Sequence, residues 1–220
     1  MSFPLENPDV ANDGTIVGEV HRSSEKRFIV MAEVNEDPIR ITTPLDFCSS
    51  PSISSHGRYI AFSSTDSLLE GDWNSGSDIY VYDREWDVLR LVPPMQQGNF
   101  SSPSVSDIGQ VVYGGYVHTE MPSEGGLSWV HHLFLYDLES NDGSILTSGA
   151  NDHSRSAFFR EKGTIVLFTS QAGNLIEMEE GPSGNGLSAP IPEYTHWHLY
   201  QKDLTTGEVR LLALHVMEEN

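Results

Sequence analysis

The sequence predicts an all-β protein, a β-propeller built of four four-stranded antiparallel blades. Turn glycines recur at Gly14, Gly57, Gly109 and Gly163, at spacings of 43, 52 and 54 residues, and an apolar strand follows each of them. Within each interval, further strands rich in β-branched and aromatic residues alternate with turns, and no stretch has a helical period. A repeat of this length with four strands is typical of a propeller blade.

The clearest repeat runs from Pro51 to Val92. Pro51–Ser54 is extended, and Gly57 supplies the positive φ of the turn that follows. Arg58–Ser64 and Asp78–Asp83 have the β-branched and aromatic content of strands. These two strands are apolar with little alternation. Such a pattern predicts burial on both faces, as in a sheet stacked between two others.

The whole chain is predicted to form one propeller domain. Its blades span approximately residues 7–43, 50–93, 102–148 and 156–214, with no second domain between them. A proline precedes the turn glycine by six residues in three copies, at Pro8, Pro51 and Pro103, and Ala157 replaces it in the fourth.

The repeat resembles the WD40-like (PD40) repeat of TolB-type β-propellers. In the second copy the resemblance rests on Pro51–Ser64 (PSISSHGRYIAFSS) and Ser77–Arg84 (SDIYVYDR), and in the third on Pro103–Gly109 (PSVSDIG). His56 stands where the family usually has Asp. The resemblance implies a propeller fold and says little about activity, because one fold hosts many functions.

The resemblance implies a ring of about six to eight blades, whereas this chain supplies four. Three arrangements accommodate four blades: a closed four-bladed ring, two chains that complete an eight-bladed ring as a homodimer, and a piece of a longer protein. A half-ring leaves large apolar blade faces uncovered at its ends. We therefore expect a self-contained four-bladed domain, with the paired assembly as the alternative.

The charge of the chain restricts its partners. Thirty-two acidic residues against twelve basic ones give a net charge of −20. This charge repels nucleic acid and anionic membranes and favours cationic partners or bound cations. Met1–Asn12 has neither a basic end nor an apolar run, so no signal peptide is expected. The protein is expected to be cytoplasmic, or periplasmic or secreted if a leader has been removed.

Loop lengths predict which end of the propeller binds a partner. In a meander, the turns between strands one and two and between strands three and four share one end of the blade. The other connections share the opposite end. The first set is short, whereas the second contains the long segments 65–77, 116–130 and 171–195. Because loops on a rigid scaffold carry binding and catalysis, we expect the long-loop end to be the functional face.

Tryptophan and histidine side chains gather at that end. The tryptophans can contact a peptide or sugar, or can cover the ends of the blades. Histidines with carboxylates can hold a transition metal or serve as acid and base. No known metal-ligand spacing is present, however. The predicted binding face comprises Trp73, His118, Trp129, His131, His196, Trp197 and His198.

The segment from Asp72 to Asp78 is a candidate calcium loop. Asp72, Asn74 and Asp78 place side-chain oxygens at alternate positions, and Gly76 allows a tight turn. No later bidentate glutamate completes such a loop. An Asx-rich turn that bonds its own backbone explains the same residues more simply.

We expect a non-enzymatic binding module that presents its acidic long-loop face to a protein or peptide. One alternative is a metal-dependent lyase or hydrolase that acts on a carbohydrate at the same face. The only cofactor it would imply is a divalent cation, either calcium or a transition metal. The other alternative is a structural half-ring that self-associates. The sequence contains no Gly-x-Ser-x-Gly nucleophile motif and no phosphate-binding glycine loop.

Overall fold

The computed structural model describes residues 4–23, 26–42, 47–72, 76–94, 98–121, 126–148, 153–160, 163–172, 175 and 197–216. Within these residues the chain forms sixteen strands in four antiparallel sheets of four strands each, which confirms the predicted fold class. The described residues contain no helix of the length and apolarity needed to span a bilayer.

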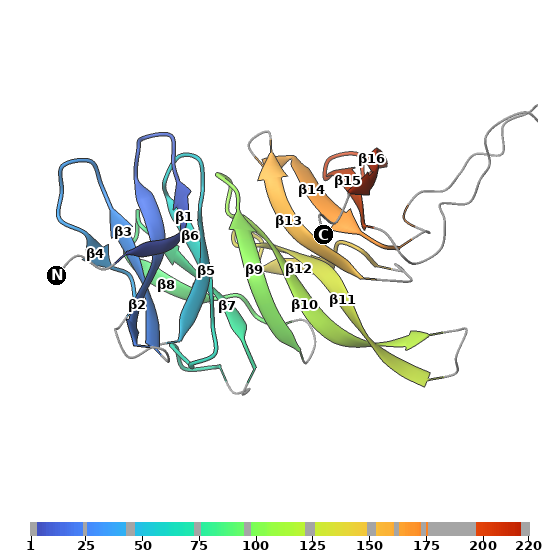
Figure 1. Cartoon of the computed structure of the whole chain (residues 1–220), viewed down its shortest axis with the longest axis horizontal. Coiled ribbons are helices and arrows are strands. Elements are labelled where there is room, and N and C mark those ends of the chain that lie inside the picture. Colours follow the sequence, from blue (N-terminus) through green and yellow to red (C-terminus); the bar gives the residue numbers. More distant parts are fainter. Residues whose placement is uncertain are drawn as a thin grey trace, which may run out of the picture.

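Each sheet is a meander in which consecutive strands pair, and we call each sheet a blade (Figure 1). The first blade contains β1 (Leu5–Val10), β2 (Ile16–Ser23), β3 (Lys26–Ala32) and β4 (Ile39–Arg40). The second contains β5 (Cys48–Ile53), β6 (Tyr59–Ser64), β7 (Asp78–Asp83) and β8 (Val88–Leu91). The third contains β9 (Asn99–Val105), β10 (Gln110–Met121), β11 (Gly126–Asp137) and β12 (Asp142–Ile145). The fourth contains β13 (Ser154–Arg160), β14 (Ile165–Ser170), β15 (Trp197–Asp203) and β16 (Val209–Val216).

The blades stand in an open row (Figure 1). Consecutive blades pack face to face, and their first strands, β1, β5, β9 and β13, contact one another in turn. The first and fourth blades lie at opposite ends of the row, and their described residues make no extended contact. The expected closed four-bladed ring is therefore wrong. Side chains fill each seam between blades and keep neighbouring sheets nearly face to face, so four blades make only an arc.

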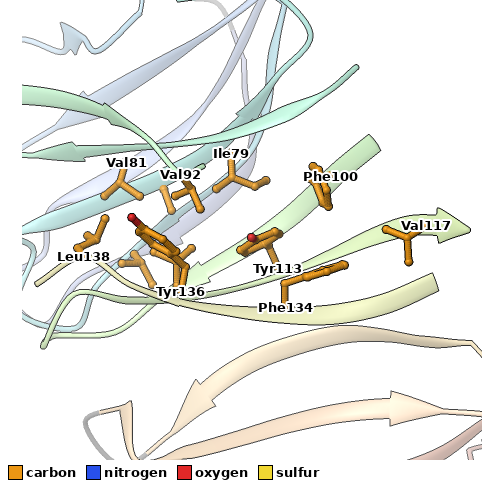
Figure 2. Close-up of a cluster of buried hydrophobic side chains, with 12 residues drawn as sticks. Ile79, Val81, Val92, Phe100, Tyr113, Val117, Phe134, Tyr136 and Leu138 are labelled. Carbon is orange, nitrogen blue, oxygen red and sulfur yellow. The ribbon is translucent and has the colours of Figure 1, made fainter. Parts of the chain in front are cut away.

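Apolar side chains from both sheets fill the seams. Figure 2 shows the seam between the second and third blades, where Ile79 and Val81 pack against aromatic residues of the third blade. Tyr113 and Phe134 stack with their ring centroids 5.4 Å apart, and Phe100 meets both rings edge-on. Corresponding clusters occupy the other two seams.

Successive residues of one strand serve different seams. Ile60 and Phe62 of β6 belong to the cluster against the first blade, whereas Ala61 between them packs towards the third blade. In β10, Val111 packs towards the second blade and Val112 towards the fourth. The burial of both faces, which the lack of alternation predicted, is confirmed.

The inner strands β1, β5, β9 and β13 share an irregularity that protects their free edges. Each has a bulge in its pairing with the second strand of its blade. Each bulge contains a residue with a positive φ of 45° to 56°, namely Asn7, Ser50, Ser102 and Ser156. The next residue is a proline in the first three blades. Bulges and prolines interrupt the hydrogen-bonding edge of a strand and so discourage pairing with another chain.

The repeated turn glycines have two physical causes. All four have a φ between +77° and +95°, which a residue with a Cβ adopts only at a cost. Gly57, Gly109 and Gly163 also allow close approach between blades. A Cβ at Gly109 would lie 3.4 Å from the Tyr59 ring, and one at Gly163 would lie 2.6 Å from the Cβ of Ser106.

A buried carboxylate joins the first two blades. Glu19 of β2 is fully buried. Its Oε1 accepts hydrogen bonds from Asn7 Nδ2 at 2.8 Å and from the Ser50 main-chain N–H at 2.7 Å. Nη1 of Arg27 and Nε2 of His21 each lie 3.7 Å from its Oε2. One side chain thus holds the bulges of two neighbouring inner strands.

Replacing Glu19 is expected to destabilise the protein. In Glu19→Ala the Ser50 N–H loses its acceptor and Arg27 loses its countercharge, so the free energy of unfolding should fall by about 2 kcal/mol in urea denaturation. The control is Glu36→Ala, at an exposed glutamate in the β3–β4 turn, which should change it by less than about 0.5 kcal/mol. Equal stability of the two variants would show that Glu19 does not hold this seam.

Candidate functional site

The inner strands line a groove on the concave side of the row. The groove has a volume of about 280 Å³ and takes residues from all four blades, from Asp9 in the first to Arg160 in the fourth. It lies where the inner strands end and the short turns to the second strands begin. No single blade forms this surface, because it exists only when four blades are packed in a row.

The middle of the groove is rich in hydroxyl groups, and each end combines an apolar with a charged side chain, Val10 with Asp9 and Phe158 with Arg160. Ser52, Ser55 and Ser104 come from the second and third blades. Val10 of the first blade is 61% exposed, and Phe158 of the fourth is 47% exposed. The groove therefore offers apolar and charged contacts at both ends and hydroxyl groups between them.

Hydrogen bonds across the seams hold the groove in shape. The Ile53 N–H donates to Asp9 Oδ2 at 2.8 Å, which joins the first two blades. The Phe159 N–H donates to Ser104 Oγ at 3.3 Å, which joins the last two. Because these contacts lie in the walls of the groove, its shape is set before any ligand arrives.

Sequence reasoning missed this groove. Its lining residues are mostly serines and apolar residues without a catalytic or metal-binding pattern, and the short-turn end was not expected to carry function. The repeat itself was the available signal, since the first strand of every blade faces the centre of a propeller.

At the long-loop end, the third blade carries a hairpin arm, visible in Figure 1 as the extension of β10 and β11. Segment 116–130 was predicted to be a loop, and that prediction is wrong. β10 and β11 pair in continuous register to the ends of both strands. β9 pairs with β10 only as far as Tyr116. Within the described chain, residues 117–121 and 126–130 pair only with one another, and we call these residues the arm.

Two of the predicted binding residues lie directly opposite each other on the arm. His118 pairs with Trp129, and at the base of the arm Tyr116 pairs with His131. Opposed residues share a face and faces alternate along a strand, so Tyr116, Trp129 and His131 lie on one face of the hairpin. Trp129 is 50% exposed and Tyr116 is 49% exposed.

Two histidines attach the base of the arm to the fourth blade. The His131 ring bonds through Nδ1 to the main-chain oxygen of Ser154, and the His131 N–H donates to Nδ1 of His153 at 3.0 Å. Tyr116 meets the His131 ring edge-on, with centroids 4.7 Å apart. Burial lowers the pKa of His131, while the hydrogen bond to Ser154 partly opposes this shift.

The other predicted residues are distributed differently. His198 is buried, so it offers no surface contact. Trp197 lies under Arg155, whose guanidinium is 3.8 Å from the ring centroid. Trp73, Asn74 and His196 lie outside the described residues, as does the side chain of His118.

In the candidate calcium loop, one carboxylate oxygen of Asp72 is engaged within the protein, whereas its Oδ1 is buried without a hydrogen-bond partner among the described residues. Asp72 Oδ2 accepts a hydrogen bond from the Tyr80 hydroxyl at 2.5 Å, and its main-chain oxygen accepts one from Ser67. Burial, together with this bond to Asp72, raises the pKa of Tyr80, which therefore stays a donor. Asp78 is fully buried opposite Ser64. Among the described residues, no three His, Cys, Asp or Glu side chains are placed to share a metal ion.

The third blade is expected to lose stability in acid. Burial lowers the pKa of His131 and His132 below the ordinary value of 6.5, so near this pH the unfolded chain binds more protons than the folded one. Their contribution to stability is complete above pH 6.5 and is lost as the pH falls through the lowered pKa values. In urea denaturation at several pH values, the free energy of unfolding of the double variant His131→Gln/His132→Gln should change less with pH than that of the wild type. If the free energies of unfolding of the two proteins change with pH in parallel, these histidines are not the cause of the loss of stability in acid.

No protein-family model matches the sequence, and no curated protein matches it. Solved structures do match. TolB from Acinetobacter baumannii is 15% identical, with a TM-score of 0.61 over 99% of this chain and 45% of that one. A protein assigned as TolB from Agrobacterium tumefaciens is 14% identical, with a TM-score of 0.59 over 100% of this chain and 64% of that one.

The β-propeller domain of the Trilobed protease from Pyrococcus furiosus is also similar. It is 15% identical, with a TM-score of 0.54 over 98% of this chain and 59% of that one. This chain spans less than two thirds of the length of each of these three proteins. The likeness confirms, at the level of fold, the resemblance seen in the repeat: the chain has the fold of TolB-type β-propellers.

Proposed function

We propose that this protein is a non-enzymatic binding module that holds a segment of a protein or peptide in the groove of its four inner strands. The groove itself supports this proposal, because it is one concave surface shared by all four blades. Val10 and Phe158 supply exposed apolar contacts at its two ends. Apolar anchors around a few polar groups are typical of sites that bind a polypeptide side chain.

The chemistry of the groove favours a side chain over a substrate undergoing covalent chemistry. Its volume of about 280 Å³ lies at the lower edge of the range of about 300–1,000 Å³ that is usual for small-molecule pockets. Its lining, all of it within the described chain, contains neither histidine nor cysteine. Those residues are the usual partners in an activated nucleophile.

The bound segment is expected to contact side chains rather than to add a strand. The bulges at Asn7, Ser50, Ser102 and Ser156 interrupt the inner edges. Prolines follow the first three of these residues and remove the N–H groups that a fifth strand would need.

The two alternatives to a binding module have less support. The carbohydrate lyase or hydrolase needs a metal centre, and no set of three ligands converges within the described chain. The self-associating half-ring needs a blade face that accepts another blade. On the outward face of the first blade, Leu5 covers Gly18, and the guanidinium of Arg40 lies 5.1 Å from the ring centroid of Phe28. These side chains cover part of the face, and Leu5 remains 37% exposed on it.

Selection of displayed random peptides against the protein tests the groove. Peptides that bind the wild type should bind Phe158→Ala at least about tenfold more weakly, because the half-exposed ring is the largest apolar anchor in the groove. Val34→Ala is the control, since Val34 is 63% exposed at the same end of the blades but lies outside the groove. Failure to select any peptide, or equal loss of affinity in both variants, would rule out the groove as the binding site.

A further inference from the structure

We propose that the arm is a second interaction surface, which receives a basic, extended segment of a protein partner across Tyr116 and Trp129. The arm lies at the long-loop end of the third blade, whereas the groove lies at the short-turn end. The proposal therefore does not depend on the groove and can fail or succeed separately from it.

The geometry of the hairpin places the two rings together. Tyr116 pairs with His131, and Trp129 lies two residues from His131 on β11. Residues two apart on a strand share a face, so Tyr116 and Trp129 are diagonal neighbours on one face, about 7–8 Å apart in ordinary strand geometry. With about half of each side chain exposed, one extended segment can contact both rings.

The Tyr116 ring is positioned before any partner binds. It meets His131 edge-on at 4.7 Å and His153 at 6.0 Å, and the planes of Tyr116 and His153 cross at 69°. His131 is in turn bonded to Ser154 and His153 of the fourth blade. A ring held in this way loses little conformational entropy when a ligand contacts it.

Charge indicates that the occupant is basic. Segment 117–130 contains the glutamates Glu120 and Glu124 and no lysine or arginine, and the whole chain carries a net charge of −20. The face of an aromatic ring attracts ammonium and guanidinium groups. A second copy of this chain is disfavoured as the occupant, because two strongly acidic molecules repel each other.

The protein already uses the same interaction within its own fold. The guanidinium of Arg58 lies 4.7 Å from the centroid of Tyr59, and that of Arg155 lies 3.8 Å from the centroid of Trp197. The positive charge of Arg155 also contributes to lowering the pKa of His131 at the base of the arm. The Arg155 guanidinium lies over the Trp197 ring, so its aromatic contact is with Trp197.

The shape of the arm indicates an extended occupant. Its two strands pair only with each other within the described chain. A two-stranded ribbon is marginally stable alone in water. A segment that lies along the ribbon buries part of its exposed face and places alternate side chains over the rings.

Two short synthetic peptides test the proposal, one alternating lysine with threonine and the other alternating glutamate with threonine. Fluorescence anisotropy at physiological salt should show binding of the lysine peptide only. Trp129→Leu keeps an apolar side chain but loses the ring, so affinity should fall by about three- to tenfold. Trp129→Phe restores a ring and should bind within about twofold of the wild type.

Trp86→Leu is the matched control. Trp86 is 64% exposed in the β7–β8 turn at the opposite end of the blades, so its replacement should leave binding of the lysine peptide unchanged. Phe158→Ala should also leave it unchanged, which separates the arm from the groove. Circular dichroism and the melting temperature establish that each variant is folded.

Three results would overturn the proposal. The first is equal affinity for the lysine and glutamate peptides. The second is an affinity for the lysine peptide that Trp129→Leu and Trp86→Leu lower equally, or that neither variant lowers. The acidic surface alone would then explain the binding. The third is concentration-dependent sedimentation of the wild type that Trp129→Leu abolishes, which would assign the arm to a second copy of the chain.

Discussion

The structure depends on the burial of both faces of each narrow sheet against its neighbours. A directly opposed, stacked aromatic pair recurs in the second and third strands of three blades. The pairs are Phe62 with Tyr80, Tyr113 with Phe134, and Phe168 with Tyr200. Each pair belongs to the apolar cluster shared with the preceding blade. The first blade has no blade before it in the row, and there Gly18 lies opposite Val30 in place of rings.

This arrangement links the stability of the fold to the shape of the groove. The apolar seams fix the distance between blades, while polar contacts at Glu19, Asp9 and Ser104 fix how neighbouring inner strands lie against one another. A polar group inside a seam is tolerated because it is hydrogen-bonded. The groove is therefore a consequence of how the blades pack, and a change that loosens a seam changes the groove as well.

The sequence predicts the blades well because the pattern of a doubly buried strand is local. Ile60-Ala61-Phe62 is apolar at every position, and Gly57 marks the turn before it. The angle between blades is not local. It depends on the side-chain volume that two sheets bring to a seam, and this is why closure was wrongly predicted. The groove combines residues as distant as Asp9 and Arg160, so no short motif records it.

The arm was mistaken for a loop for a related reason. The segment 122–126 reads PSEGG, and this composition dominates a search for turns. The short strands beside it, such as Val117-His118-Thr119, are too brief to be recognised alone. Their strand character comes from the continuous register of β10 with β11, in which each residue has a partner on the other strand.

The two proposed surfaces differ in how the backbone is presented to a partner. At the groove, a bulge interrupts every inner edge, and it contains a proline in every inner strand but β13, where Ala157 takes that place. Recognition there must rest on side chains, which suits a single residue held between Val10 and Phe158. The arm is an uninterrupted ribbon whose exposed rings follow the alternation of the strand. Such a surface suits a segment that is itself extended, because only an extended chain repeats its side chains with the same period.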